Sequence, residues 1–217
     1  MMRLPARTTG VVMSVLALLL SQAAAQQPSQ QTEPEDLWPC VQRKVPELSL
    51  PQIWNGPEIP EEAKDWREDR EVADLVQELA QRRVPMEEAQ QRIRDFAESL
   101  KPEEHDQRLF KLAEGLFEHM NQERSHVMSG IERVAQKQIR LADSIRKENL
   151  ALDSLTRDPK ANPTEVQRQT EAFNFSTRMF QERAQSITYV CEVPTLIEQR
   201  LYRLANTIVP LIADKKG

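Results

Sequence analysis

The chain has 217 residues, and 29 basic against 34 acidic residues give a net charge of −5, which argues against binding to nucleic acid or to an anionic membrane. Glycine occurs only five times, so the usual signals of β-hairpin turns and phosphate-binding loops are missing. Helix-forming residue types dominate instead, and this composition predicts an all-α protein.

Residues 1–25 have the three parts of a secretory signal peptide: a basic start, an apolar run from Val11 to Leu20, and three alanines before Gln26. We expect cleavage before Gln26 and a soluble periplasmic protein of 192 residues. Its net charge would be −7, because the removed piece carries two arginines and no acid. An uncleaved anchor is the alternative, but the apolar run is about half of the roughly 20 residues that span a bilayer, and we expect no stable membrane insertion after cleavage.

The chain holds two cysteines, Cys40 and Cys191, and both follow the predicted cleavage site. In an oxidising compartment such a pair typically forms a disulfide. We therefore predict a Cys40–Cys191 disulfide, with two separately buried thiols as the alternative.

The segment before the helices divides into two parts. Residues 26–36 are polar and lack a hydrophobic anchor, which predicts a disordered leader. Residues 37–60 contain five prolines and two tryptophans, Trp38 and Trp54. Because prolines at that density exclude a long helix, we expect a proline-rich strap that lies on the following domain, residues 61–214. We favour packed roles for the two tryptophans over an exposed binding face.

Helical periodicity begins after Pro60. Apolar residues at spacings of three and four predict a first helix over 60–83 and a second over 85–100, separated by Pro85. The strongest pattern follows: steps of three and four from Phe110 to Leu155 meet an apolar residue at eleven of fourteen positions, against about five or six expected from the overall composition. This pattern predicts one unbroken helix over 103–157, too long for a compact globule of this size.

A turn at 158–163 should reverse the chain, with Asn162 as the N-cap of a fourth helix that Pro194 kinks. One antiparallel register aligns the apolar residues of both long segments and pairs Leu141 with Phe180 and Phe117 with Leu204. The predicted fold is therefore a long antiparallel, coiled-coil-like helical hairpin. Two shorter helices pack at its base, and the strap is tied to its middle.

Four further expectations follow from this register. Gly130 should leave room for the strap near Cys191, and Gln138 should face Arg183 in a polar layer. The base should bury apolar residues that lie off the seam, which is the line of residues at alternating spacings of three and four along each long segment. The off-seam residues are Leu109, Leu112, Leu116, Leu196, Ile197, Tyr202 and Val209. The distal half of the hairpin has fewer such residues and should project as a bare arm.

Two groups of residues are candidate sites. His119, Glu123 and His126 share one helical face and have ligand types that bind divalent metals, although solvated side chains are the more common explanation of this spacing. Phe175 and Met179 lie off the seam near the arm and form a candidate partner site, with packing against Ile139 or Leu150 as the alternative.

No nucleophile, acid–base pair or cofactor motif is apparent, so we expect neither a catalytic residue nor a cofactor. The expected function is that of an exported, non-enzymatic helical scaffold or adaptor whose arm binds another envelope protein or its own copy. The alternative is a periplasmic metal-responsive or metal-carrying helical protein.

Overall fold

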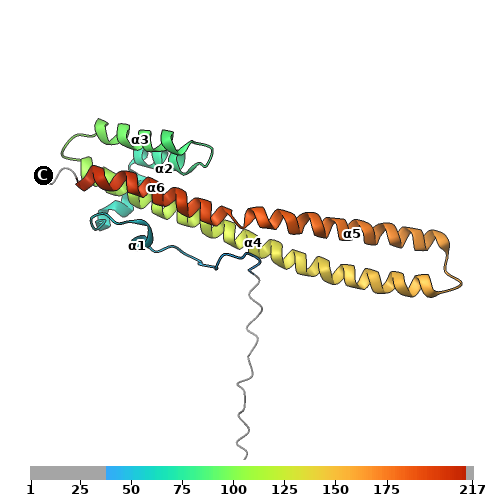
Figure 1. Ribbon diagram of the computed structural model, residues 1–217. Helices are drawn as coiled ribbons and strands as arrows, with labels where there is room; N and C mark the ends of the chain where they lie inside the picture. The colour runs from blue at the N-terminus through green and yellow to red at the C-terminus, as the bar shows by residue number, and fades with distance from the viewer. Residues whose placement is uncertain (1–37, 214–217) are drawn as a thin grey trace, which may run out of the picture. The chain divides into compact units, whose positions relative to one another are not determined.

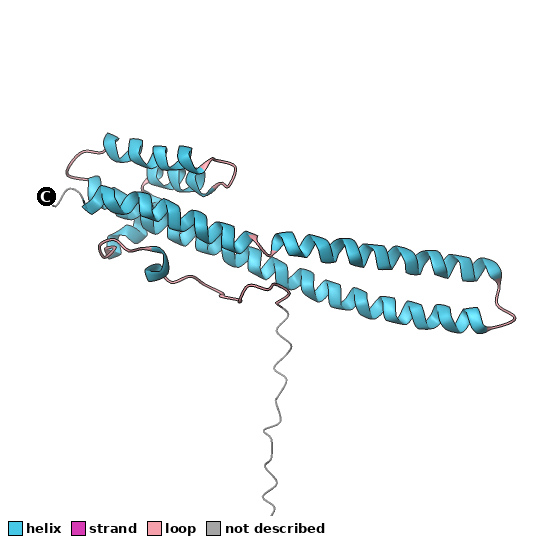
Figure 2. Cartoon of the chain, viewed as in Figure 1, coloured by secondary structure: helices cyan, strands magenta, loops and turns pink. Residues whose placement is uncertain are grey.

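The computed structural model describes residues 38–213. This range contains six α-helices and one 3₁₀ helix, joined by loops, and no strand (Figures 1 and 2). The predicted signal peptide 1–25 and leader 26–36 lie outside the described residues. In chain order the elements are α1 (Leu50–Ile53), η1 (Glu61–Glu68), α2 (Arg70–Ala80), α3 (Met86–Ser99), α4 (His105–Arg157), α5 (Pro163–Val190) and α6 (Val193–Ala213). The all-α class is thereby confirmed.

The long helix α4 is continuous over 53 residues, as the heptad pattern predicted. At about 1.5 Å per residue it extends roughly 80 Å. A short turn then reverses the chain, and the side chain of Asn162 accepts a hydrogen bond from the backbone N–H of Thr164 at 2.9 Å, with Pro163 in the first turn of α5. The predicted N-cap is therefore present.

The return segment is broken, and the break lies earlier than predicted. The helix α5 ends at Val190, and a turn at Cys191 and Glu192 separates it from α6. Pro194 lies in the first turn of α6, where a missing backbone N–H costs no helical hydrogen bond. The turn before Pro194, and not a kink at it, divides the segment.

The two long segments form an antiparallel hairpin, in which α4 lies beside α6 in its first half and beside α5 in its second half (Figure 1). The side chain of Gln138 donates a hydrogen bond to the backbone carbonyl of Phe180 at 2.8 Å. This contact places Phe180 within one helical turn of its predicted partner, Leu141. We call residues 132–157 of α4 together with α5 the arm, and the remaining helices the base.

The core lies in the base, where α4 and α6 pack with α2 and α3. Its fully buried side chains include Leu79, Ile93, Leu109, Leu112, Leu116, Met120, Ile197, Leu201, Leu204 and Ile208. Each such side chain contributes on the order of 1.5–3 kcal/mol to folding. Two of the residues predicted to pack there do not, because Leu196 and Tyr202 are 48% and 46% exposed on the outer face of α6.

The predicted single helix over 60–83 is wrong, because the chain breaks at Asp69. Its backbone is extended (φ −84°, ψ 98°), and its carboxylate accepts from the backbone N–H of Val72 at 3.2 Å, which caps α2. Arg108 of α4 donates to the same carboxylate at 2.7 and 2.9 Å. The break is therefore held by a residue 39 positions away in the chain.

Candidate functional site on the helical arm

The strap, residues 38–60, is held along α4 by polar side chains of α4 that contact the backbone of the strap. Arg124 donates to the carbonyl of Val45 at 2.7 Å, and Asn121 exchanges two hydrogen bonds with the backbone of Leu48 at 3.1 and 3.2 Å. Arg124 is buried, and desolvation lowers its pKa from the ordinary value. Loss of this carbonyl would leave a buried guanidinium N–H without an acceptor, so the contact holds the strap on α4.

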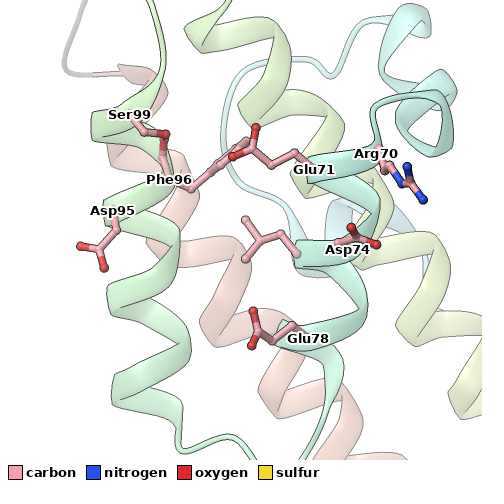
Figure 3. Close-up of a pocket in the computed structure, with 8 residues that line it drawn as sticks. Arg70, Glu71, Asp74, Glu78, Asp95, Phe96 and Ser99 are labelled. Carbon is pink, nitrogen blue, oxygen red and sulfur yellow. The ribbon is translucent and has the colours of Figure 1, made fainter.

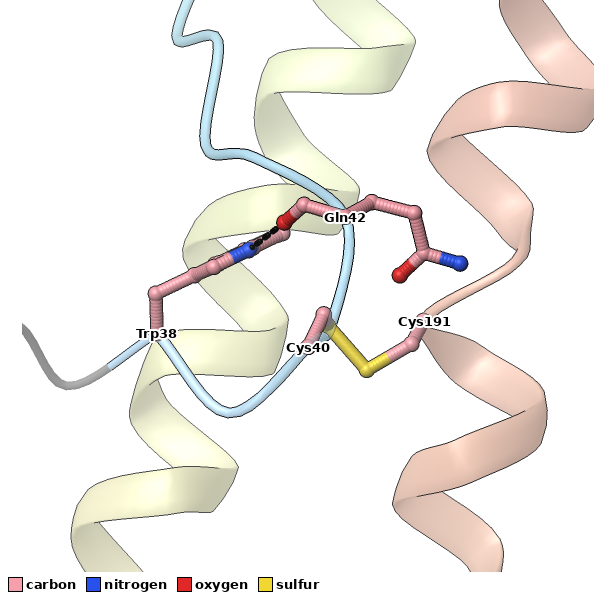
Figure 4. The surroundings of a disulfide bond; sticks show 4 residues. All are labelled: Trp38, Cys40, Gln42 and Cys191. Carbon is pink, nitrogen blue, oxygen red and sulfur yellow. Dashed lines mark hydrogen bonds between the residues drawn. A yellow bond between two sulfur atoms is a disulfide. The ribbon is translucent and has the colours of Figure 1, made fainter.

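The Cys40–Cys191 disulfide is confirmed, with the two Cα atoms 5.5 Å apart (Figure 4). Cys191 is buried in the turn between α5 and α6, so the disulfide joins the strap to the point where the arm meets the base. Trp38 donates to the carbonyl of Gln42 at 2.6 Å and closes the strap around Cys40.

The expected role of Gly130 is wrong. A Cβ atom at this position would meet only the guanidinium of Arg133, 3.7 Å away, and no strap atom within 4 Å. The strap instead meets α4 at Asn121, Arg124 and Glu132, the last through an ion pair with Lys44. Gly130 faces a different groove, described below.

The arm lacks a buried core on its α5 side: none of the 28 residues of α5 is buried. Seam residues such as Leu141, Phe173 and Phe180 are only half-buried. Several large apolar side chains are exposed on the arm, namely Val134, Ile139, Leu150, Phe175, Tyr189 and Val190. Because apolar surface of this extent gains free energy when it is covered, the arm is the candidate interaction surface.

A groove of about 420 Å³ runs between α4 and α5 where the arm meets the base, and we call it the arm groove. Its walls are Val127, Gly130, Ile131 and Val134 of α4 and Arg183, Ser186, Ile187 and Val190 of α5. Val134 and Val190 remain 41% and 43% exposed. The arm groove is therefore apolar along most of its length, with Arg183 as the charged group in its wall.

The predicted partner residues Phe175 and Met179 lie on this same side of α5. They precede Arg183 at spacings of eight and four residues, so all three share one helical stripe with Val190. Phe175 is 57% exposed and Met179 is half-buried. Ile139 and Leu150, the residues of the alternative, are themselves 45% and 69% exposed.

The predicted polar layer of Gln138 and Arg183 does not form. Gln138 is buried and donates to the Phe180 carbonyl, while its side-chain oxygen has no partner. It lines a second groove of about 340 Å³ beside the disulfide, whereas Arg183 lines the arm groove. The Gln138 contact agrees with the predicted register to within one helical turn, but the side chains of Gln138 and Arg183 line different grooves.

The predicted metal ligands are not gathered into a site. His119 and Glu123 border a shallow hollow next to the end of α2, and His126 is exposed. Within residues 38–213, no group of three His, Cys, Asp or Glu side chains is arranged to hold a metal ion. Metal binding by His119, Glu123 and His126 stays a prediction that a thermal shift with zinc would test.

A surface hollow of about 840 Å³ lies between α2 and α3 and contains four carboxylates (Figure 3). Two of them are paired with arginines: Glu71 accepts from Arg108 at 2.8 Å, and Glu78 forms an ion pair with Arg92. The hydroxyl of Ser99, which could otherwise act as a nucleophile, donates to the carbonyl of Phe96 at 2.7 Å. These contacts tie the base helices together.

Across the described part of the chain, no helix combines the length and the apolar character that crossing a membrane requires.

Comparison with known proteins returned no match among protein-family models, curated proteins or solved structures. Function is therefore inferred from the chain's own residues.

Proposed function

We propose that this protein is an exported, non-enzymatic helical scaffold or adaptor, and that its arm binds another envelope protein or a second copy of the chain. The observation that carries the proposal is the absence of any buried residue along α5, together with the exposed apolar side chains that flank it. A two-helix layer in water gains little stability from itself, and a third element against it would bury the half-exposed seam.

The rigid attachment of the arm also supports this role. The first half of α4 is packed in the core of the base. Where the arm begins, the strap is held to α4 by hydrogen bonds and to the α5–α6 turn by the disulfide. A recognition surface on a rigid element loses little conformational entropy on binding. The arm can thus present its apolar stripe without a folding step.

The experiment is quantitative recovery of bound proteins from the exporting cell with a tagged chain. Replacing Phe175 and Met179 together by Ser should lower partner recovery about tenfold, since an exposed aromatic anchor in an interface is typically worth more than 1 kcal/mol. The helical circular dichroism signal should not change, because neither residue is buried.

Leu196→Ser supplies a matched control. It removes an apolar side chain of similar exposure, but from α6 of the base, and should leave recovery unchanged. Undiminished recovery with the Phe175 and Met179 variant, or equal loss with Leu196→Ser, would count against the arm as the binding surface.

A further inference from the structure

The residues that line the arm groove indicate which kind of partner would bind there, provided that the proposed function holds. Its floor and rims are apolar at Ile131, Val134, Ile187 and Val190. Gly130 leaves a gap in the α4 wall, because its missing side chain would otherwise project there. An apolar channel between two antiparallel helices is the geometry into which a third helix packs.

The length of the groove suits a short stretch of helix. The residues that line it extend from Val127 to Val134 on α4 and from Arg183 to Val190 on α5. Each wall therefore spans about 10 Å, or two turns, at 1.5 Å per residue. Two turns accommodate a helix that presents apolar residues at positions i, i+3 or i+4, and i+7.

Two cations at the arm groove lack carboxylate partners in residues 38–213. Arg183 lines the wall and Arg133 places its guanidinium next to Gly130, and neither forms an ion pair there. Most other arginines of the arm are paired with acids, such as Arg146 with Asp143 and Arg168 with Glu165. Carboxylates on a ligand would therefore complement the charge of this groove.

We propose that the arm groove receives an acidic amphipathic helix of a partner protein. The apolar stripe of that helix packs on Ile131, Val134 and Ile187, and its carboxylates pair with Arg133 and Arg183. A second copy of the chain fits less well. Two arm grooves placed face to face would bring these arginines next to their own copies, and like charges across an interface lower affinity.

The test uses two synthetic 18-residue alanine-based helices labelled with fluorescein, each with leucines at i, i+3 and i+7. One carries glutamates beside this stripe and its twin carries lysines at the same positions. Anisotropy titrations with the purified chain should show the glutamate helix binding about fivefold or more tightly than its twin, the factor that 1 kcal/mol of ion pairing gives.

Three variants of the chain locate the binding. Arg183→Glu should reverse the preference between the two helices. Gly130→Leu should weaken both by about tenfold or more, because its side chain fills the gap in the wall. Arg178→Glu makes the same charge change on another face of α5 and should alter neither affinity by more than about twofold. Position 130 tolerates a side chain, since a Cβ there makes only an ordinary 3.7 Å contact.

Equal affinity for the two helices, or unchanged binding by Gly130→Leu, would overturn this assignment. So would a dimer of the chain in sedimentation experiments that Gly130→Leu dissociates, because the occupant would then be a second copy. If Gly130→Leu still recovers a cellular partner that the Phe175 and Met179 variant loses, the groove assignment fails while the proposed function stands.

Discussion

Replacing Gly115 by alanine should destabilise the protein, whereas the same substitution at Gly130 of the same helix should stabilise it. A Cβ at position 115 would lie 2.8 Å from a methyl carbon of Val76 and 2.9 Å from the ring of Trp66. Both neighbours are buried, and the Trp66 ring is held by a 2.9 Å hydrogen bond from its Nε1 to Glu118. Neither can move aside without disturbing the contact between η1, α2 and α4.

The magnitude follows from two opposing terms. Alanine gains about 0.8–1 kcal/mol over glycine inside a helix at either position. At Gly115 the extra methyl also incurs an overpacking cost of about 1–3 kcal/mol. Because the helix term cancels between the two variants, their free energies of unfolding should differ by the packing cost alone, about 1–3 kcal/mol.

Urea denaturation followed by circular dichroism at 222 nm measures this difference directly. In thermal unfolding it corresponds to a gap in Tm of about 2–12 °C, taking roughly 2–4 °C per kcal/mol for a chain of this size. A Gly115→Ala variant as stable as Gly130→Ala would refute the reasoning, since it would mean that η1 and α2 are not packed against α4 at Gly115.

Three other outcomes are expected. Replacing Cys40 and Cys191 by Ala, which opens a loop of 151 residues, should lower the free energy of unfolding by about 5 kcal/mol on a chain-entropy basis, and wild type with a reducing agent should match the variant. Arg200→Met should cost about 2–4 kcal/mol in urea denaturation, because this buried guanidinium donates at 2.8 and 3.0 Å to two carbonyls at and just beyond the end of α2. The hydrogen bond from Arg108 lowers the pKa of Asp69 in the folded protein. The ionised Asp69 carboxylate therefore stabilises the fold above the ordinary carboxyl pKa, and this stabilisation is lost as the pH falls through the lower folded pKa. Urea denaturation of Asp69→Asn should show a flatter loss of stability below about pH 4 than wild type.

The long helices could be predicted because their determinants are local and repeated. The heptad spacing from Phe110 to Leu155 sets the extent of α4, and the Asn162–Pro163 pair sets the start of α5. The register followed from matching two apolar stripes, and the Gln138 contact with Phe180 lies within one turn of it. Such patterns repeat often enough that single exceptions do not obscure them.

The features that were missed depend on residues distant in the chain. The break at Asp69 depends on Arg108, and the exposure of Leu196 and Tyr202 depends on which face of α6 the short helices cover. The arm groove had one local signal, since Gly130 is a small residue next to the seam residue Ile131. The sequence pattern could not decide whether the space beside Gly130 faced the strap. Local spacing does not determine which side of a helix pair other elements cover, because that depends on tertiary packing.

The disulfide has a consequence for the order in which the protein matures. Cys40 is made early, but its partner Cys191 lies in the turn between the last two helices, 151 residues later. The disulfide therefore cannot form until α4 and α5 have been synthesised and the turn after α5 lies beside the strap. A ribosome stalled after Arg157 would leave a chain whose strap is held on α4 by non-covalent contacts only, such as those of Asn121, Arg124 and Glu132, so covalent closure requires that the return segment has been made.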